Sequence, residues 1–262
     1  DERFAPIASP AREFPFDVLV AASATGLEGL PEGARVGTSA PRRRAQIAAL
    51  RSDVDLVPLR GNIETRMGFV TSGELDAVVL AGAGLSRTNR LDRASHRFGP
   101  EEMLPAPAQG ALAVEARADD DYAAAAVATV DDPETTLAVA AERRVLAVLE
   151  AGCTAPVGAY ASLDGDELRL DAVVASVAGT RVLRESASAV IPGRSGDGSA
   201  HGETVAQAAR LEAARALGEQ VAAALLERGA AEVVLVAGEF EDERTPLAPP
   251  ISGKPPDGGP PE

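Results

Sequence analysis

A single cysteine and several clustered arginines have the most distinctive chemistry in this sequence. Cys153 is the only cysteine among 262 residues, so it cannot form a disulfide within the chain. Gly152 and Pro156 flank it and predict a helix end followed by a tight loop that could present the thiol to a cleft. Because a lone cysteine is more often a small buried apolar residue, its position alone leaves both interpretations open.

Three segments place arginines directly after an expected strand. They are GTSAPRRR at 37–44, LRGNIETR at 59–66 and AGAGLSR at 81–87. In the first segment, a turn with Thr38 and Ser39 enters a helix, whose positive end favours an anion. Adjacent arginines would repel each other there, so we expect a negative ligand to compensate them, with a solvated basic helix face as the alternative.

Arginine binds carboxylates and phosphates through two parallel hydrogen bonds, and ligands of open parallel sheets bind outside the carboxyl ends of the strands. The three segments therefore predict a site for a ligand with several carboxylates or phosphates. The candidate arginines are Arg42, Arg43, Arg60, Arg66 and Arg87.

Other classes of site lack their sequence signals. His96 and His201 have no companions at metal-ligand spacing, so we assign no metal. The sequence also contains no serine nucleophile elbow, phosphate-binding loop or dinucleotide glycine fingerprint.

The composition restricts the partners of the chain. A net charge of −15 argues against binding to nucleic acid. No apolar run approaches the ~18 residues of a membrane span, and the first residues do not resemble a signal peptide, so we expect no membrane and a cytoplasmic location. Lys254 is the only lysine, which indicates either a genome of high GC content or adaptation to high salt.

The order of the elements predicts an α/β fold. Strands at 16–21, 34–37, 54–59 and 75–81 alternate with helices at 42–51 and 62–72, which is typical of parallel strands with crossover helices. Asp132 and Pro133 begin a helix that runs to the loop of Cys153. An antiparallel meander follows, then a long helix that starts with a capping box of Thr204 and Gln207, and a last strand at 231–237.

We expect five parts in the chain. Residues 1–10 are the remnant of a first domain, because prolines interrupt them and no upstream segment offers a strand partner. A second, α/β domain covers 11–103, and 104–130 returns to the first domain after a proline-rich boundary. Residues 131–240 form a small α+β domain with an antiparallel sheet, and 241–262, rich in acidic residues, proline and glycine, form a disordered tail.

Several motifs together resemble the porphobilinogen deaminase (hydroxymethylbilane synthase) family. They are GTSAPRRRAQ at 37–46, LRGNIETR at 59–66, LDAVVLAGAGLSR at 75–87, LPAPAQGALAVEAR at 104–117 and ETTLAVAAERRVLAVLEAGCTAPVGAY at 134–160. The resemblance covers about residues 11–240 and implies a parallel or mixed sheet of the periplasmic-binding-protein type.

The resemblance also implies a function. The family joins four porphobilinogens into hydroxymethylbilane with loss of ammonia, in tetrapyrrole synthesis, on a dipyrromethane cofactor held by a cysteine thioether. Cys153 matches that cysteine, and the five candidate arginines match those that bind the acetate and propionate groups. Thr38, Ser39 and Gln109 match further cofactor-binding positions, although Ala108 replaces a glycine beside Gln109. We expect a monomer.

The family's catalytic aspartate would lie a few residues before Asp1, so the resemblance places no catalytic residue within 1–262. We therefore expect these residues alone to be inactive. The alternative is a binding module for polycarboxylates, of the two-lobed binding-protein type, which would use the arginines without Cys153.

Overall fold

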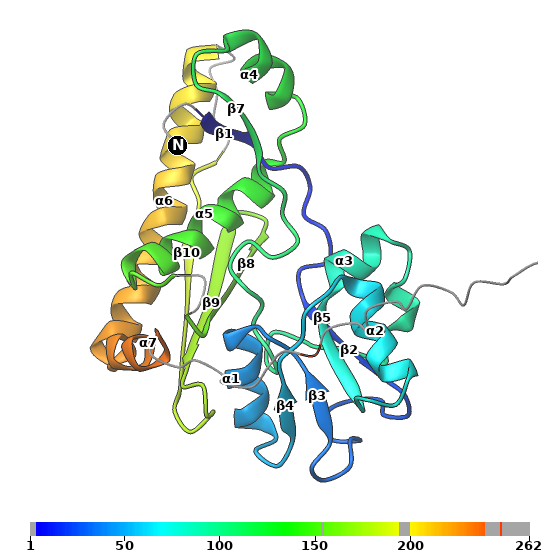
Figure 1. Cartoon of the computed structure of the whole chain (residues 1–262). Helices are drawn as coiled ribbons and strands as arrows, with labels where there is room; N and C mark the ends of the chain where they lie inside the picture. Colours follow the sequence, from blue (N-terminus) through cyan, green and yellow to red (C-terminus); the bar gives the residue numbers. More distant parts are fainter. Residues whose placement is uncertain (1–3, 153–154, 194–199, 239–246, 248–262) are drawn as a thin grey trace, which may run out of the picture.

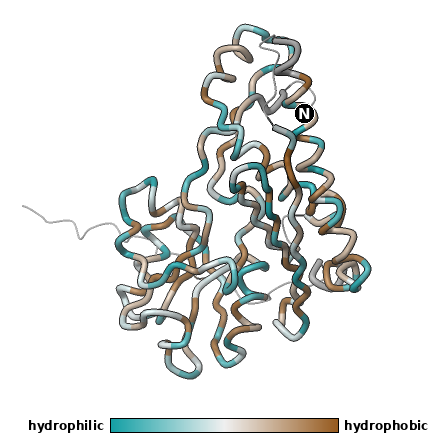
Figure 2. Tube along the Cα trace, turned by 180° about the vertical axis from the view of Figure 1, so that it is seen from behind, coloured by the Kyte–Doolittle hydropathy of each residue, from teal (hydrophilic) through white to brown (hydrophobic). Residues whose placement is uncertain are grey.

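The computed structural model describes residues 4–152, 155–193, 200–238 and 247. Its strands form a five-stranded, a three-stranded and a two-stranded sheet; in Figure 1 the two-stranded sheet, β1 with β7, lies above the other two. In Figure 2, hydrophobic stretches run through the interior of the trace, whereas many outer loops are hydrophilic.

The five-stranded sheet is mixed and has the order β4-β3-β5-β2-β6. Its strands are β2 (Asp17–Ala21), β3 (Arg35–Gly37), β4 (Asp55–Val57), β5 (Ala77–Ala81) and β6 (His96–Arg97). β3 is parallel to β4 and β5, as predicted. β2 instead runs antiparallel to β5 and β6, so the prediction of a parallel strand at 16–21 is wrong in direction. The reason is that residues 22–34 contain no crossover helix.

Helices cover both faces of this sheet. They are α1 (Pro41–Leu50), α2 (Ile63–Thr71) and α3 (Gly82–Arg87), followed by the short 3₁₀ helix η1 (Leu91–Arg93). Leu19 and Val79 pack with Ile47 of α1 in one core, while Val78 packs with Phe69 of α2 in another. Because successive strand residues point to opposite faces, the apolar run of β5 fills both cores.

The antiparallel sheet of the C-terminal half has the order β10-β9-β8 and confirms the predicted meander. Its elements are α5 (Pro133–Val148), β8 (Val157–Asp164), β9 (Glu167–Ala175), β10 (Val182–Val190), α6 (Ala200–Glu227) and α7 (Ala230–Gly238). The side chain of Asp132 accepts a hydrogen bond of 2.8 Å from the Thr135 N–H, so the predicted cap of α5 is confirmed. Leu137, Val145 and Leu217 pack with the sheet in one core.

Two predictions for this half are wrong. α6 begins at Ala200, so Thr204 lies within the helix and does not cap it. The segment 231–237 belongs to helix α7 and is not a strand. A short apolar run fits either element, and here Ala230 and Val233, three residues apart, are both buried in the core beside α6.

A third, small sheet pairs two distant segments. β1 (Phe4–Ala8) runs antiparallel to β7 (Val114–Arg117), and α4 (Asp121–Ala128) lies beside them. β7 therefore supplies the strand partner that the sequence did not reveal for β1. Within the described ranges, no helix has the length and apolar character needed to cross a bilayer.

Candidate active site

The carboxyl ends of β3, β4 and β5 meet at one edge of the five-stranded sheet, because these three strands are parallel. The three arginine-bearing segments follow these ends, so they begin at the same edge of the sheet. β2 is antiparallel and pairs Asp17 with Ala81, the last residue of β5. The start of β2 therefore brings a carboxylate to the same edge.

Asp17 forms ion pairs with both arginines that begin α1. Its Oδ2 lies 2.7 Å from Nη1 of Arg42, and its Oδ1 lies 2.7 Å from Nη2 of Arg43. All three side chains are buried. Burial raises the pKa of Asp17, but the charges of Arg42 and Arg43 outweigh this effect and hold the pKa below its ordinary value. The compensation that we expected from a ligand is therefore supplied by an internal carboxylate.

The hydroxyls of the first turn bind the protein backbone. Ser39 Oγ donates to the Leu59 carbonyl oxygen and accepts from the Leu59 N–H, both at 2.6 Å. Thr38 is buried, and its Oγ1 accepts from the Ala40 N–H at 3.4 Å. Ser39 thus ties the loop after β3 to the loop after β4, whereas the Thr38 hydroxyl stabilises its own turn.

The other three arginines form no ion pair with a carboxylate among the described residues. Arg66 is half-buried, and its Nε donates to the Gly61 carbonyl oxygen. Burial, and then the charge of Arg43, lower the pKa of Arg66, so the two guanidinium groups are near each other. Arg60 and Arg87 are exposed, and Arg87 donates to the Gly110 carbonyl oxygen at 2.8 Å. The charge of Arg87 also contributes, after hydrogen bonds from Phe14 and Ser86, to a lowered pKa of Glu13, so a carboxylate lies near Arg87 without forming a direct ion pair.

The side chain of Gln109 is fully used by protein partners. Its Nε2 donates to the Pro15 carbonyl oxygen at 2.7 Å and to Oδ1 of Asp17 at 3.0 Å, while its Oε1 accepts from Arg42 at 3.4 Å. An amide nitrogen has two hydrogens, and both have acceptors here. In this arrangement Gln109 holds the arginine cluster to the segment after Leu104.

A second buried ion pair links this segment to the C-terminal half. Arg12 donates from both of its terminal nitrogens to Glu142 of α5, with distances of 2.6 and 3.1 Å. Glu142 also accepts from the backbone N–H groups of Ala108 and Ala161. Complete burial raises the pKa of Glu142, although Arg12 and these hydrogen bonds oppose the shift.

Cys153 lies outside the described residues, but the chain on both sides of it is placed. α5 ends at Val148, and β8 begins at Val157. Gly158 packs so closely that a Cβ there would lie 2.9 Å from the Leu104 carbonyl oxygen, which also accepts from Arg42. Gly158, five residues after Cys153 in the sequence, therefore packs against the segment that the Arg42 side chain contacts.

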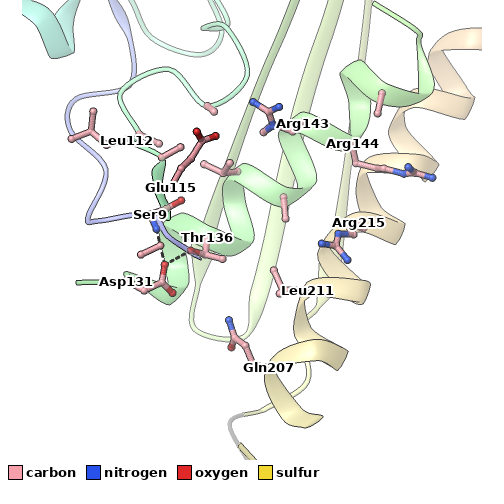
Figure 3. Close-up of a pocket in the computed structure, with 17 residues that line it drawn as sticks. Ser9, Leu112, Glu115, Asp131, Thr136, Arg143, Arg144, Gln207, Leu211 and Arg215 are labelled. Carbon is pink, nitrogen blue, oxygen red and sulfur yellow. Dashed lines mark hydrogen bonds between the residues drawn. The ribbon is translucent and has the colours of Figure 1, made fainter. Parts of the chain in front are cut away.

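A separate hollow of about 820 Å³ lies between the β1–β7 sheet and helices α5 and α6. Figure 3 shows Arg143, Arg144 and Arg215 on the helices along it, with Glu115 and Asp131 on the other side. Asp131 accepts from the Ser9 N–H and from Thr136 Oγ1. None of the site residues predicted from the sequence lines this hollow in the described part of the chain.

Two family models match the chain. The model described as "Porphobilinogen deaminase, dipyromethane cofactor binding domain" matches residues 1–125, and the one described as "Porphobilinogen deaminase, C-terminal domain" matches 136–227. The chain belongs to the porphobilinogen deaminase family.

Curated relatives carry the same name. The chain is 56% identical over 175 residues to porphobilinogen deaminase of Corynebacterium diphtheriae, covering 67% of the chain and 60% of the relative. It is 48% identical over 233 residues to porphobilinogen deaminase 1 of Streptomyces coelicolor, covering 86% and 68%. It is 50% identical over 250 residues to porphobilinogen deaminase of Nocardia farcinica, covering 92% and 66%. The chain thus spans about two thirds of these deaminases.

The resemblance to porphobilinogen deaminases did not single out Asp17, Arg12 or Glu142. A signal existed for Glu142, because a carboxylate beside the apolar stripe of Leu137, Ala141 and Val145 is unusual on a buried helix face. Asp17 lies at the start of an apolar strand, but its ion-pair partners Arg42 and Arg43 are 25 and 26 residues away in the sequence. The described residues contain no group of three or more histidine, cysteine, aspartate or glutamate side chains arranged to hold a metal ion.

Proposed function

We propose that this chain forms part of an enzyme that joins four porphobilinogens into hydroxymethylbilane with release of ammonia, in tetrapyrrole synthesis. The observation that carries the proposal is the convergence of Arg60, Arg66 and Arg87 on one sheet edge, where none of the three forms a direct ion pair among the described residues. Acetate and propionate groups suit such arginines, because guanidinium groups bind carboxylates through two parallel hydrogen bonds.

The dipyrromethane cofactor fits the charge of this edge, and we propose that Cys153 holds it through a thioether. When bound, the cofactor supplies the pyrrole carbon to which the first porphobilinogen is joined. Arg60, Arg66 and Arg87 would bind and orient its carboxylates, while Arg42, Arg43 and Gln109 hold the wall of the site in place. Ser39 would act through the two loops that it connects, and Thr38 through the turn that it stabilises.

The remaining proposals concern the domains, the location, the oligomeric state and the catalytic acid of the enzyme. Helices on both faces of the five-stranded sheet support a binding-protein-like second domain at 11–103, with residues 1–10 and 104–130 belonging to a first domain and 131–240 to a third. We propose a cytoplasmic monomer whose substrate is porphobilinogen. The catalytic acid would lie upstream of Asp1, so residues 1–262 alone would be inactive.

Intact-protein mass spectrometry tests the attachment. The chain would be extended upstream to the length of its relatives, and compared with its Cys153→Ser variant. We expect the added mass of a dipyrromethane on the first protein and none on the second, because a hydroxyl is a far poorer nucleophile at neutral pH. Added mass on both proteins would place the cofactor elsewhere. Reversible polycarboxylate binding without added mass on either would favour a binding module.

A further inference from the structure

The buried carboxylate of Asp17 lies between two arginines that the sequence assigns to ligand binding. Its two oxygens contact different guanidinium groups, those of Arg42 and Arg43, each at 2.7 Å. We propose that Asp17 is a positioning residue that fixes this arginine pair and sets the net charge of the arginine site. The inference rests on the proposed function, because it concerns the carboxylates that the same site accepts.

The position of Asp17 is fixed by the sheet. β2 is an inner strand that pairs with β5 on one side and β6 on the other. The Asp17 carbonyl oxygen accepts from the Phe98 N–H, and its Oδ1 also accepts from Gln109. Asp17 is completely buried, so its carboxylate has no water-filled space into which it could swing. The carboxylate is therefore a permanent partner of the arginine pair.

The hydrogen-bond donors of Arg42 and Arg43 are used by partners within the protein. Nε and Nη2 of Arg43 both donate to Asp17, and its Nη1 donates to the Val79 carbonyl oxygen. Nη1 of Arg42 contacts Asp17 and the Leu104 carbonyl oxygen. The two arginine residues are 5% and 8% exposed, which leaves little surface for a ligand. Asp17 thus fills the place where a ligand carboxylate would otherwise bridge them.

The charge balance gives Asp17 its influence on ligand binding. One carboxylate and two guanidinium groups leave a single net positive charge in the buried cluster. Arg66 already responds to the charge of Arg43, which lowers its pKa. Because buried charges are weakly screened, removing the Asp17 charge should raise the attraction of the whole edge for anions. Asp17 therefore limits how many ligand carboxylates the site holds.

Calorimetry with butane-1,2,3,4-tetracarboxylate as the probe tests this role. The proteins are the wild-type chain, Asp17→Ala and the control Val18→Ala, which removes a buried neutral side chain from the same strand. We expect Asp17→Ala to bind the probe on the order of tenfold more tightly. Removing the carboxylate leaves one more net positive charge in the cluster, and a probe carboxylate about 10 Å from that charge would gain roughly this factor at an effective dielectric constant near 20. Val18→Ala should bind it as the wild type does.

Acetate supplies the second measurement. Acetate should fill the cavity of Asp17→Ala, raise its melting temperature above that in chloride of equal ionic strength, and return its probe affinity to the wild-type value. Acetate should change neither the melting temperature nor the probe affinity of Val18→Ala. Unchanged or weaker probe binding by folded Asp17→Ala, or no response to acetate, would overturn the inference.

A second variant covers the case in which Asp17→Ala does not fold. Asp17→Asn keeps the size of the side chain, removes its charge and should bind the probe on the order of tenfold more tightly, whereas unchanged or weaker binding would contradict the charge-setting role. If the wild type does not bind the probe, the proposed polycarboxylate site fails. The acetate-dependent melting of Asp17→Ala then still decides whether Asp17 holds the arginine pair.

Discussion

At the scale of single residues, the contacts of the arginines divide them into two groups, those paired within the protein and those left for a ligand. Arg42 and Arg43 are buried against Asp17, whereas Arg60, Arg66 and Arg87 form no direct ion pair among the described residues. The sequence predicts that arginines follow the strand ends, because residue type and strand order suffice for this. It does not reveal the pairing, because the direction of β2 decides which carboxylate reaches the edge.

Arg66→Leu should weaken binding of the tetracarboxylate probe. Arg66 is half-buried, and losing one partner of a partly desolvated charge pair costs about 2 kcal/mol, or about thirtyfold in the dissociation constant. Arg35→Leu is the matched control, since Arg35 begins β3 at the opposite edge of the sheet and is exposed. Calorimetric titration of both variants checks this, and equal losses would contradict the assignment of the site.

The stability of the chain should fall at low pH through Asp17. Burial raises its pKa, but Arg42 and Arg43 lower it further, so the folded-state pKa lies below the ordinary value of 3.8. The stabilisation is then complete above that value and is lost as the pH falls through the lower, folded-state pKa. Urea unfolding from pH 6 down to about pH 2 should show a shallower acid loss for Asp17→Asn than for the wild type. Parallel curves would show that Asp17 does not titrate in this way.

At the scale of elements, the sequence predicted the features that depend on neighbouring residues, such as a helix cap and the ends of strands. Asp132 caps α5, and the strands ending at Gly37, Val57 and Ala81 lie where the apolar runs placed them. The direction of β2 and the helical form of α7 were missed, because both depend on distant packing partners. A short apolar run is compatible with strand and helix until the surrounding core selects one.

The close approach of α5 and α6 gives a test at this scale. A Cβ on Gly218 of α6 would lie 2.4 Å from the Ala141 carbonyl oxygen, so Gly218→Ala should destabilise the fold by about 1–3 kcal/mol through overpacking. Gly68 of α2 has open space around its Cβ position, and Gly68→Ala should stabilise by about 0.5–1 kcal/mol. Urea unfolding measures both, and a stabilised Gly218→Ala variant would contradict the packing.

At the scale of the whole molecule, a few buried contacts connect the sheets. Arg12 and Ala108 lie in the two segments that run between the β1–β7 sheet and the five-stranded sheet, and both bind Glu142 of α5. Leu247, the one described residue of the predicted tail, pairs with Leu59 and accepts from the Arg60 N–H. Such contacts join segments far apart in the sequence, so no local pattern predicted them, and the five-part division of the chain stays a prediction.

Glu142→Gln should lower the free energy of unfolding, because it weakens the contacts of Glu142 with Arg12 and Ala108. The amide would present N–H groups to donors and leave Arg12 without its buried counter-charge, which costs about 3–5 kcal/mol. Glu134→Gln, on an exposed residue of the same helix, should cost less than about 1 kcal/mol. Denaturant unfolding compares the two, and equal costs would show that the Arg12–Glu142 pair does not hold the parts of the molecule together.

The most direct test of the proposed activity is ammonia release from porphobilinogen. Two proteins would be compared, residues 1–262 and the same chain extended upstream to the length of its relatives. General acid–base and electrostatic contributions each typically supply about a hundredfold in rate or more, and we place the acid upstream. We predict ammonia release and a dipyrromethane on Cys153 for the extended chain, and no measurable turnover with little cofactor for residues 1–262. An extended chain that carries the cofactor but releases no ammonia would contradict the proposed reaction, and turnover by residues 1–262 would contradict the upstream acid.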